Sequence, residues 1–173
     1  MRIQFTLALA GLIAFNVNAK EPLHAYLSSG VEVHETDNMN RVEATGPNIR
    51  FFLKDKKILA TAFVFKDTRN PYPLLNDFAE QFLKRAYASY DYQIFEKNKV
   101  MNNFANRKSD GVEYLVDLGG EKCELYLASS VGNQTYIFFN ISNEVTNAKC
   151  ASIGDKLKSV VTQVNESIAI NDI

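Results

Sequence analysis

The sequence lacks the short motifs that identify the common hydrolases and nucleotide-binding enzymes. It contains no Gly-x-Ser-x-Gly, His-Glu-x-x-His or Ser-x-x-Lys pattern and no P-loop. It has two histidines, His24 and His34, so few general bases are available to activate a nucleophile. Paired carboxylates such as Asp110 and Glu113 occur, as they do in any chain with 20 acidic residues. We therefore predict no catalytic residue and no cofactor, and favour a non-enzymatic protein, with an enzyme as the alternative.

A strong charge of either sign is also missing. The formal net charge is -1, which gives no electrostatic reason to expect nucleic acid or an anionic membrane surface as a partner. The sequence has no internal repeats or low-complexity segments, and its 46% hydrophobic and 12% aromatic residues argue against disorder. These properties predict a globular domain.

Only one long apolar run is present, and it lies at the N-terminus. Met1–Arg2 is positively charged, Phe5–Phe15 is apolar, and Val17–Ala19 has the small-residue pattern after which signal peptidase cuts. The run is too short to span a bilayer, and no later stretch predicts membrane insertion. We expect residues 1–19 to be a cleavable signal peptide and the mature protein, beginning at Lys20, to be periplasmic or secreted. No cysteine stands at the cleavage site to carry a lipid anchor.

Cysteine is scarce, since Cys123 and Cys150 are the only two. An exported protein meets an oxidising environment, so we expect them to bond to each other. Closing a loop of roughly 27 residues is worth about 3 kcal/mol in the chain-entropy model. Two buried free thiols are the alternative. A metal site is disfavoured because no further cysteine or nearby histidine completes a ligand set.

Other potential metal ligands gather at one place, where His34 is flanked by Glu32, Glu35 and Asp37. Glu32 and His34 lie on the same face of an alternating segment whose valines face inward. Their spacing matches no recognised ligand signature. We interpret these residues as the polar face of a half-exposed strand and predict no metal site.

Hydrophobic periodicity predicts a mixture of strands and helices. Alternating or continuous apolar patterns predict strands over Val31–His34, Arg41–Thr45, Asn48–Leu53, Ile58–Phe65, Tyr92–Phe95, Lys99–Ala105, Val112–Leu118, Lys122–Ala128 and Thr135–Ile141. Gly46-Pro47 and Ser109-Asp110-Gly111 are turn signals between strands. Ile58–Phe65 and Thr135–Ile141 are apolar on both faces, so both strands would need to be covered on both sides.

Apolar residues at helical spacing predict one helix from about Pro73 to Ser89 and a second from about Ala151 to Ile168. Two amphipathic helices can cover strands that are apolar on both faces. We therefore predict an α+β fold, in which an antiparallel sheet of about six to eight strands has helices packed against it and one disulfide. Residues 20–173 would form a single domain.

This order of elements, several strands, a helix, a meander of strands and a C-terminal helix, resembles the Mog1/PsbP-like fold. That fold includes small exported bacterial proteins, and the resemblance covers most of the mature chain. It implies a binding or accessory module without a shared catalytic site. Because it rests on topology, it assigns no role to any individual residue.

Two basic clusters and one aromatic cluster are candidate partner-binding residues. They are Lys54, Lys56 and Lys57 at one predicted hairpin tip, Arg107 and Lys108 at another, and Tyr90 and Tyr92, with Tyr87, after the first helix. The simpler interpretation of the basic residues is solvated turns that protect sheet edges. Tyrosines at such a position more often close the edge of the core.

These observations favour an exported, non-enzymatic binding or accessory protein of the bacterial envelope that recognises a protein or a small ligand. Its partner would be another envelope or secreted protein. A periplasmic immunity or inhibitor protein that neutralises a toxin or hydrolase is one alternative. A small periplasmic hydrolase is the other, and would require a deep pocket with convergent polar groups and shifted pKa values.

Overall fold

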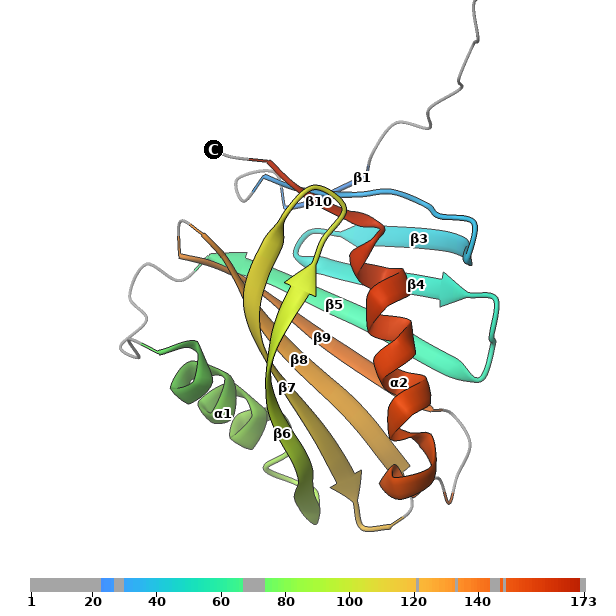
Figure 1. Ribbon diagram of the computed structural model, residues 1–173, viewed down its shortest axis with the longest axis vertical. Coiled ribbons are helices and arrows are strands. Elements are labelled where there is room, and N and C mark those ends of the chain that lie inside the picture. The colour runs from blue at the N-terminus through green and yellow to red at the C-terminus, as the bar shows by residue number, and fades with distance from the viewer. Residues whose placement is uncertain are drawn as a thin grey trace, which may run out of the picture.

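An antiparallel sheet of seven strands forms the centre of the molecule (Figure 1). The strands are β3 (Met39–Thr45), β4 (Asn48–Leu53), β5 (Ile58–Lys66), β6 (Tyr92–Asn103), β7 (Lys108–Leu118), β8 (Lys122–Gly132) and β9 (Thr135–Asn143). Their order across the sheet is β3-β4-β5-β9-β8-β7-β6, and every neighbouring pair is antiparallel. The predicted α+β class and strand number are confirmed.

The computed structural model describes residues 30–66, 74–120, 122–132, 134–143, 147 and 149–171, and the backbone of β1 (Leu23–Tyr26). The predicted signal peptide and Pro73 lie outside the described residues. Within them, Gly46 has φ +56°, a left-handed conformation that glycine adopts without strain, and the predicted Gly46-Pro47 turn between β3 and β4 is present.

A second, three-stranded sheet joins the two ends of the described chain. Its order is β1-β2-β10, where β2 is Val31–Val33 and β10 is Ile168–Ile170. Both valines of β2 are fully buried, as their alternation predicts. The prediction that Ile168 ends a helix is wrong, because the chain turns at residues 166–167 and Ile168 pairs with Val33.

Two helices pack on the seven-stranded sheet, one on each face. Helix α1 (Leu75–Ala86) contacts β7 and β8, and helix α2 (Cys150–Asn165) crosses β6 to β9. The inward residues of α2 that the 3.6-residue spacing predicts are buried, with Leu157 and Val164 fully so. Helix α1 is shorter than predicted, since it ends at Ala86.

The apolar side chains form two separate clusters, one on each face of the sheet. The α2-side cluster extends from Val42 in β3 to Leu115 in β7 and includes residues of β2 and β10 from the small sheet. The α1-side cluster is smaller and rests on β7, β8 and β9 under Phe78 and Leu83 of α1. Strand β9 lies between the two clusters and is buried on both faces, as predicted.

The predictions for residues 92–111 need two corrections. The two predicted segments Tyr92–Phe95 and Lys99–Ala105 are one edge strand, β6, with an irregularity between Ile94 and Glu96. Ser109-Asp110-Gly111 is not a turn but part of β7, with Gly111 paired to Val100. The chain instead reverses at residues 104–107, where Phe104 N–H donates to the Arg107 carbonyl at 2.9 Å. An edge strand exposed on both faces shows little hydrophobic alternation, so its full length is hard to recognise.

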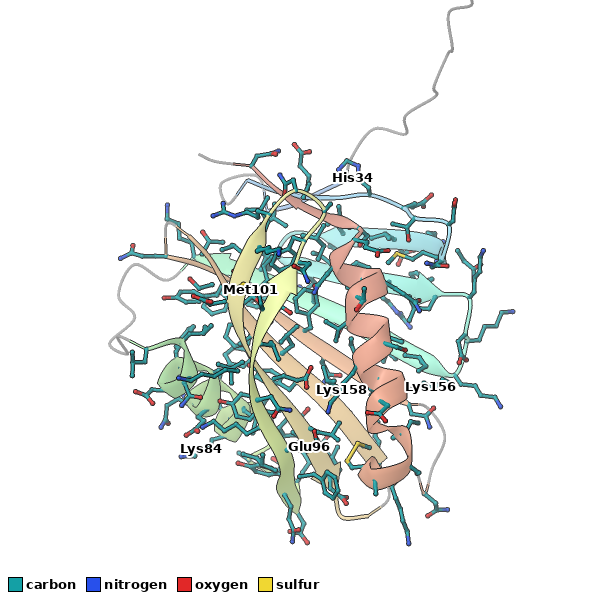
Figure 2. All side chains as sticks on the ribbon, in the orientation of Figure 1. His34, Lys84, Glu96, Met101, Lys156 and Lys158 are labelled. Carbon is teal, nitrogen blue, oxygen red and sulfur yellow. A yellow bond between two sulfur atoms is a disulfide. The ribbon has the colours of Figure 1, made fainter. Side chains whose placement is uncertain are left out.

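Cys123 and Cys150 form the predicted disulfide, and both are buried. The bond joins β8 to the first residue of α2 on the α2 side of the sheet. Ion pairs hold the same helix elsewhere: Lys158 Nζ lies 2.5 Å from Glu96 Oε2 of β6 (Figure 2). The helix is thus fixed to the sheet by covalent, ionic and apolar contacts.

Candidate functional site

One half of the α1 side of the sheet is left without a helix. Helix α1 lies over β7, β8 and β9, and within the described residues no helix covers β3 and β4 on that face. Strand β5 reflects this division, since its α2-side residues are buried whereas Thr61 and Phe63 on the other face are half-buried. The prediction that β5 is covered on both faces is therefore only half right. The uncovered area is the candidate site.

Strand register places a continuous row of polar side chains across this face. Successive cross-strand partners are Glu43 and Arg50, Arg50 and Thr61, Thr61 and Asn140, and Asn140 and Tyr126. Partners in an antiparallel sheet project to the same side with adjacent Cβ atoms. The row therefore runs from the open edge of the sheet to the end of helix α1.

A cleft of about 490 Å³ lies along this row, which is within the size range of small-ligand sites. Aromatic residues from three strands and from helix α1 form much of its wall, and Glu43 and Arg50 lie at its outer end. Its aromatic side chains are Phe63, Phe82, Tyr87, Tyr126 and Phe138, whereas Phe139 borders the cleft but belongs to the α2-side cluster. Phe82 of α1 stacks on Phe138 with ring centres 4.4 Å apart, so the helix end and the sheet form one aromatic surface.

A buried carboxylate, Glu124, supports the inner end of the cleft. It accepts hydrogen bonds from the Tyr87 hydroxyl at 2.5 Å, from Asn140 Nδ2 at 2.8 Å and from Lys122 Nζ at 2.5 Å. Burial alone would raise the pKa of Glu124, but the hydrogen bonds from Lys122, Tyr87 and Asn140 lower it overall. Burial and the neighbouring carboxylate raise the pKa of Tyr87. Glu124 is thus held ionised and Tyr87 neutral, and Asn140 is fixed in position.

Tyr126 is the unusual residue of the cleft. Its side chain is almost completely buried, at 3% exposure, and packs against Phe82 and Phe138. Its hydroxyl has no hydrogen-bond partner among the described residues. Burial raises its pKa, so the hydroxyl stays protonated and able to donate. A buried hydroxyl without a partner costs about 1–3 kcal/mol and is rare in native proteins.

A second, smaller cleft of about 350 Å³ continues along β4 and shares Arg50 with the first. The guanidinium groups of Arg41 and Arg50 lie over the Phe52 ring, at 4.4 Å and 4.9 Å from its centre. Arg41 is also paired with Glu43 at 2.8 Å. Lys56 lines the same cleft, so one residue of the predicted basic cluster joins a basic surface that strand register creates.

The other candidate basic residues lie in two separate places (Figure 1). Lys54 and Lys57 are exposed in the β4–β5 turn around Asp55, which is paired with Lys156 of α2 at 2.6 Å. Arg107 and Lys108 lie where the β6–β7 hairpin turns back, and Asn106 there exchanges two 2.9 Å hydrogen bonds with the Ile170 backbone. The two clusters do not form one surface, and their role in partner binding stays a prediction.

The three tyrosines after α1 divide between core and surface. Tyr87 is buried, Tyr92 is half-buried and Tyr90 is 60% exposed. The rings of Tyr90 and Tyr92 contact Tyr87 at centroid distances of 6.1 Å and 5.6 Å. Of the three, Tyr87 lines the cleft. Partner binding by Tyr90 and Tyr92 stays a prediction.

The described residues contain no group of three or more side chains suited to hold a metal ion. His34 Nε2 lies 3.9 Å from Glu32 Oε2, and both side chains are partly exposed. Neither described helix has the length and hydropathy of a membrane span.

Sequence reasoning did not find the cleft residues. Glu43, Arg50, Thr61, Asn140 and Tyr126 come from five strands and lie side by side only because of register. Arg50, Thr61 and Asn140 do interrupt otherwise apolar strands, which is the one signal that could have indicated them.

Solved structures resemble this one, among them a cyanobacterial PsbP and a Mog1 mutant. The solution structure of cyanobacterial PsbP (CyanoP) from Synechocystis sp. PCC 6803 is 14% identical, covers 86% of this chain and 91% of that chain, and gives a TM-score of 0.54. A mutant of the protein Mog1 is 6% identical, covers 88% of this chain and 96% of that chain, and gives a TM-score of 0.51. No protein-family model and no curated protein sequence matches the chain. The chain has the Mog1/PsbP-like fold that its order of elements predicts.

Proposed function

We propose that this chain is an exported, non-enzymatic binding or accessory protein of the bacterial envelope, which recognises a protein or a small ligand through the cleft on the α1 side of the sheet. The observation that carries this proposal is the uncovered half of that sheet face. It combines aromatic walls, a row of polar side chains and a buried hydroxyl that has no partner among the described residues. Such a surface is typical of recognition sites, which are largely apolar with a few placed polar groups.

The chemistry of the cleft argues against the alternative of a hydrolase. Among the described residues that line it, none is histidine, serine or cysteine. The pKa shifts also have the wrong direction for catalysis near neutral pH: Glu124 is held ionised, and burial keeps Tyr87 and Tyr126 neutral. The polar groups are fixed as hydrogen-bond donors and acceptors, as binding requires.

Native mass spectrometry of the protein isolated without denaturation from its own envelope fraction tests the proposal. We expect a bound mass, either a small molecule or a second protein, on the wild-type chain. The double variant Tyr126→Phe, Arg50→Gln should lose it, whereas Lys99→Gln on the opposite edge strand should keep it. A wild-type chain without a bound component, or a double variant that keeps it, would contradict the proposal. A bound toxin or hydrolase would identify an immunity or inhibitor protein.

Export is a separate part of the proposal. The intact mass of the protein recovered from the envelope fraction should correspond to a chain that begins at Lys20. A mass that includes residues 1–19 would contradict signal cleavage without affecting the binding proposal.

A further inference from the structure

We propose that the cleft binds a small aromatic acid, whose ring lies against the aromatic wall, whose inner end accepts a hydrogen bond from Tyr126, and whose carboxylate meets Arg50. This inference rests on the proposed function and adds the chemical class of the ligand. Three observations within the described residues define that class: the Tyr126 hydroxyl without a hydrogen-bond partner, the aromatic wall, and the Arg50 guanidinium without a paired carboxylate.

The inner end of the cleft requires a hydrogen-bond acceptor. Two tyrosines stand on neighbouring strands of the same face, paired in register, and only one has its hydroxyl satisfied. The Tyr114 hydroxyl lies 3.3 Å from the Asn76 carbonyl, whereas the Tyr126 hydroxyl has no partner among the described residues. The neighbouring Asn140 directs its Nδ2 to Tyr87 and Glu124 and not to the Tyr126 hydroxyl. A ligand oxygen would therefore supply the hydrogen-bond acceptor that the described residues do not provide for Tyr126.

The middle of the cleft requires a flat apolar body. Phe82 from α1 and Phe63 from β5 both line it, and Phe82 is already stacked at 4.4 Å on Phe138. Aromatic rings prefer stacked or edge-to-face contacts with other rings, which contribute beyond the area buried. A single aromatic ring fits a cleft of about 490 Å³ with room for polar groups at each end.

The outer end requires an anion. Arg41 and Glu43 neutralise each other, but Arg50 is paired with no carboxylate in the described part of the chain, and its guanidinium rests over the Phe52 ring. Lys56 adds a second positive charge along the continuing cleft. A planar guanidinium recognises carboxylates through two parallel hydrogen bonds.

Strand spacing sets the length of the ligand. Tyr126 and Arg50 are three strand steps apart, through Asn140 and Thr61, so their Cα atoms are separated by roughly 14 Å. Both side chains project from the same face and occupy part of that distance. A molecule with one ring and a short acid chain therefore spans the two groups, and 3-(4-hydroxyphenyl)propionate carries its two oxygen-bearing groups at opposite ends in this way.

NMR titration of purified residues 20–173 with 3-(4-hydroxyphenyl)propionate tests the inference. We expect amide shifts at Thr61, Phe63 and Asn140 that saturate, with a Kd at least 5-fold lower than for 3-phenylpropionate, which lacks the phenolic oxygen. The neutral analogue 4-(3-hydroxypropyl)phenol should also bind at least 5-fold more weakly. Equal binding of all three, or shifts away from the cleft, would overturn the inference.

Amino-acid substitutions test which residue binds each end of the probe. Tyr126→Phe should remove the preference for the phenolic probe over 3-phenylpropionate, and Arg50→Gln should remove the preference for the acid over the neutral analogue. Tyr114→Phe and Lys99→Gln, which alter a paired hydroxyl and a remote charge, should leave both preferences unchanged. A merely structural Tyr126 would lower the melting temperature when changed to Phe, whereas we expect a melting temperature equal to or above that of the wild type. If native mass spectrometry shows a bound component but the probe does not bind, the ligand class is wrong and the proposed function stands.

Discussion

The two faces of the central sheet are built differently. On the α2 face, the helix crosses β6 to β9, a disulfide joins it to β8, and ion pairs join it to β6 and to the β4–β5 turn. The α1 face is covered on one half only, and polar residues cross its open half. One face thus supplies most of the apolar burial, while the other keeps side chains accessible.

This division separates stability from recognition within one sheet. The α2 side carries the larger apolar cluster, together with a few buried polar side chains, of which Asn102 hydrogen-bonds to Ser129 and Asn165. On the α1 side, specific hydrogen bonds satisfy the buried Glu124, whereas the Tyr126 hydroxyl has no partner in the described part of the chain. Proteins commonly accept such a local cost where a surface serves binding.

The largest expected effect is a core truncation on the α2 face. Leu125→Ala should lower the free energy of unfolding by about 3–4 kcal/mol, because Leu125 is fully buried and a cavity would remain. Phe63→Ala in the open cleft should cost only about 1–2 kcal/mol, because its side chain is already partly in water. Urea unfolding of both variants measures the difference, and similar losses would contradict the contrast between the faces.

Removing the disulfide should have the next largest effect. The double variant Cys123→Ala, Cys150→Ala should lose about 3 kcal/mol relative to the oxidised protein, since the unfolded chain regains the freedom of the closed loop. Urea unfolding measures this loss. The wild type under reducing conditions is the matched control and should lose a comparable amount. An unchanged stability in both would show that apolar packing alone fixes α2.

Replacing either of two buried glutamates by glutamine should change the stability of the protein, and the two changes should differ in direction. The hydrogen bonds to Glu124 outweigh burial and lower its pKa, so its contribution to stability is present above the unfolded pKa of about 4.3 and is lost as the pH falls through the folded pKa. Glu124→Gln should therefore cost about 1–2 kcal/mol at pH 7. Thermal unfolding from pH 7 to pH 3 should show a shallower acid loss than in the wild type.

Glu113 under α2 is the matched control. Burial raises its pKa, with partial compensation by Lys158 at 3.9 Å, so its ionised form costs stability above the folded pKa. That cost disappears as the pH falls from the raised folded value towards about 4.3. Glu113→Gln should leave the stability at pH 7 unchanged or slightly raised. Equal losses in both glutamate variants would overturn the assigned pKa directions.

The smallest effect is expected at the rim of the cleft. Glu43→Gln should change the unfolding free energy by less than about 0.5 kcal/mol, because its pair with Arg41 is exposed. Denaturant unfolding at low and high salt checks this, and a larger loss would indicate that the open edge of the sheet depends on ionic contacts.

Most elements, but not the site, could be predicted from the sequence. Strand β9 and the inward stripe of α2 were recognisable because burial leaves a strong apolar pattern. The disulfide could be predicted because the chain has only two cysteines and an exported protein meets an oxidising environment. Edge strand β6 and the short strand β10 were missed or misassigned, because exposed or three-residue strands carry little periodic signal and tertiary pairing decides their structure.

The residues of the cleft cannot be recognised from the hydrophobic pattern of the sequence, because the order of the strands brings them together. Its polar row needs the order β4-β5-β9-β8, in which residues 50 and 126 are separated by only two strands. Its depth needs a helix that ends at Ala86 and leaves β3 and β4 uncovered. Both are properties of topology.

The pairing of β2 with β10 has a consequence for how the chain is made. Residues 31–33 hydrogen-bond to residues 168–170, so the small sheet cannot close until almost the whole sequence has been synthesised. If the chain crosses a membrane as a linear thread, its early segments emerge on the far side with their last pairing partner still behind them. Such a delay keeps the polypeptide open during passage, and completes the fold only when transit has ended.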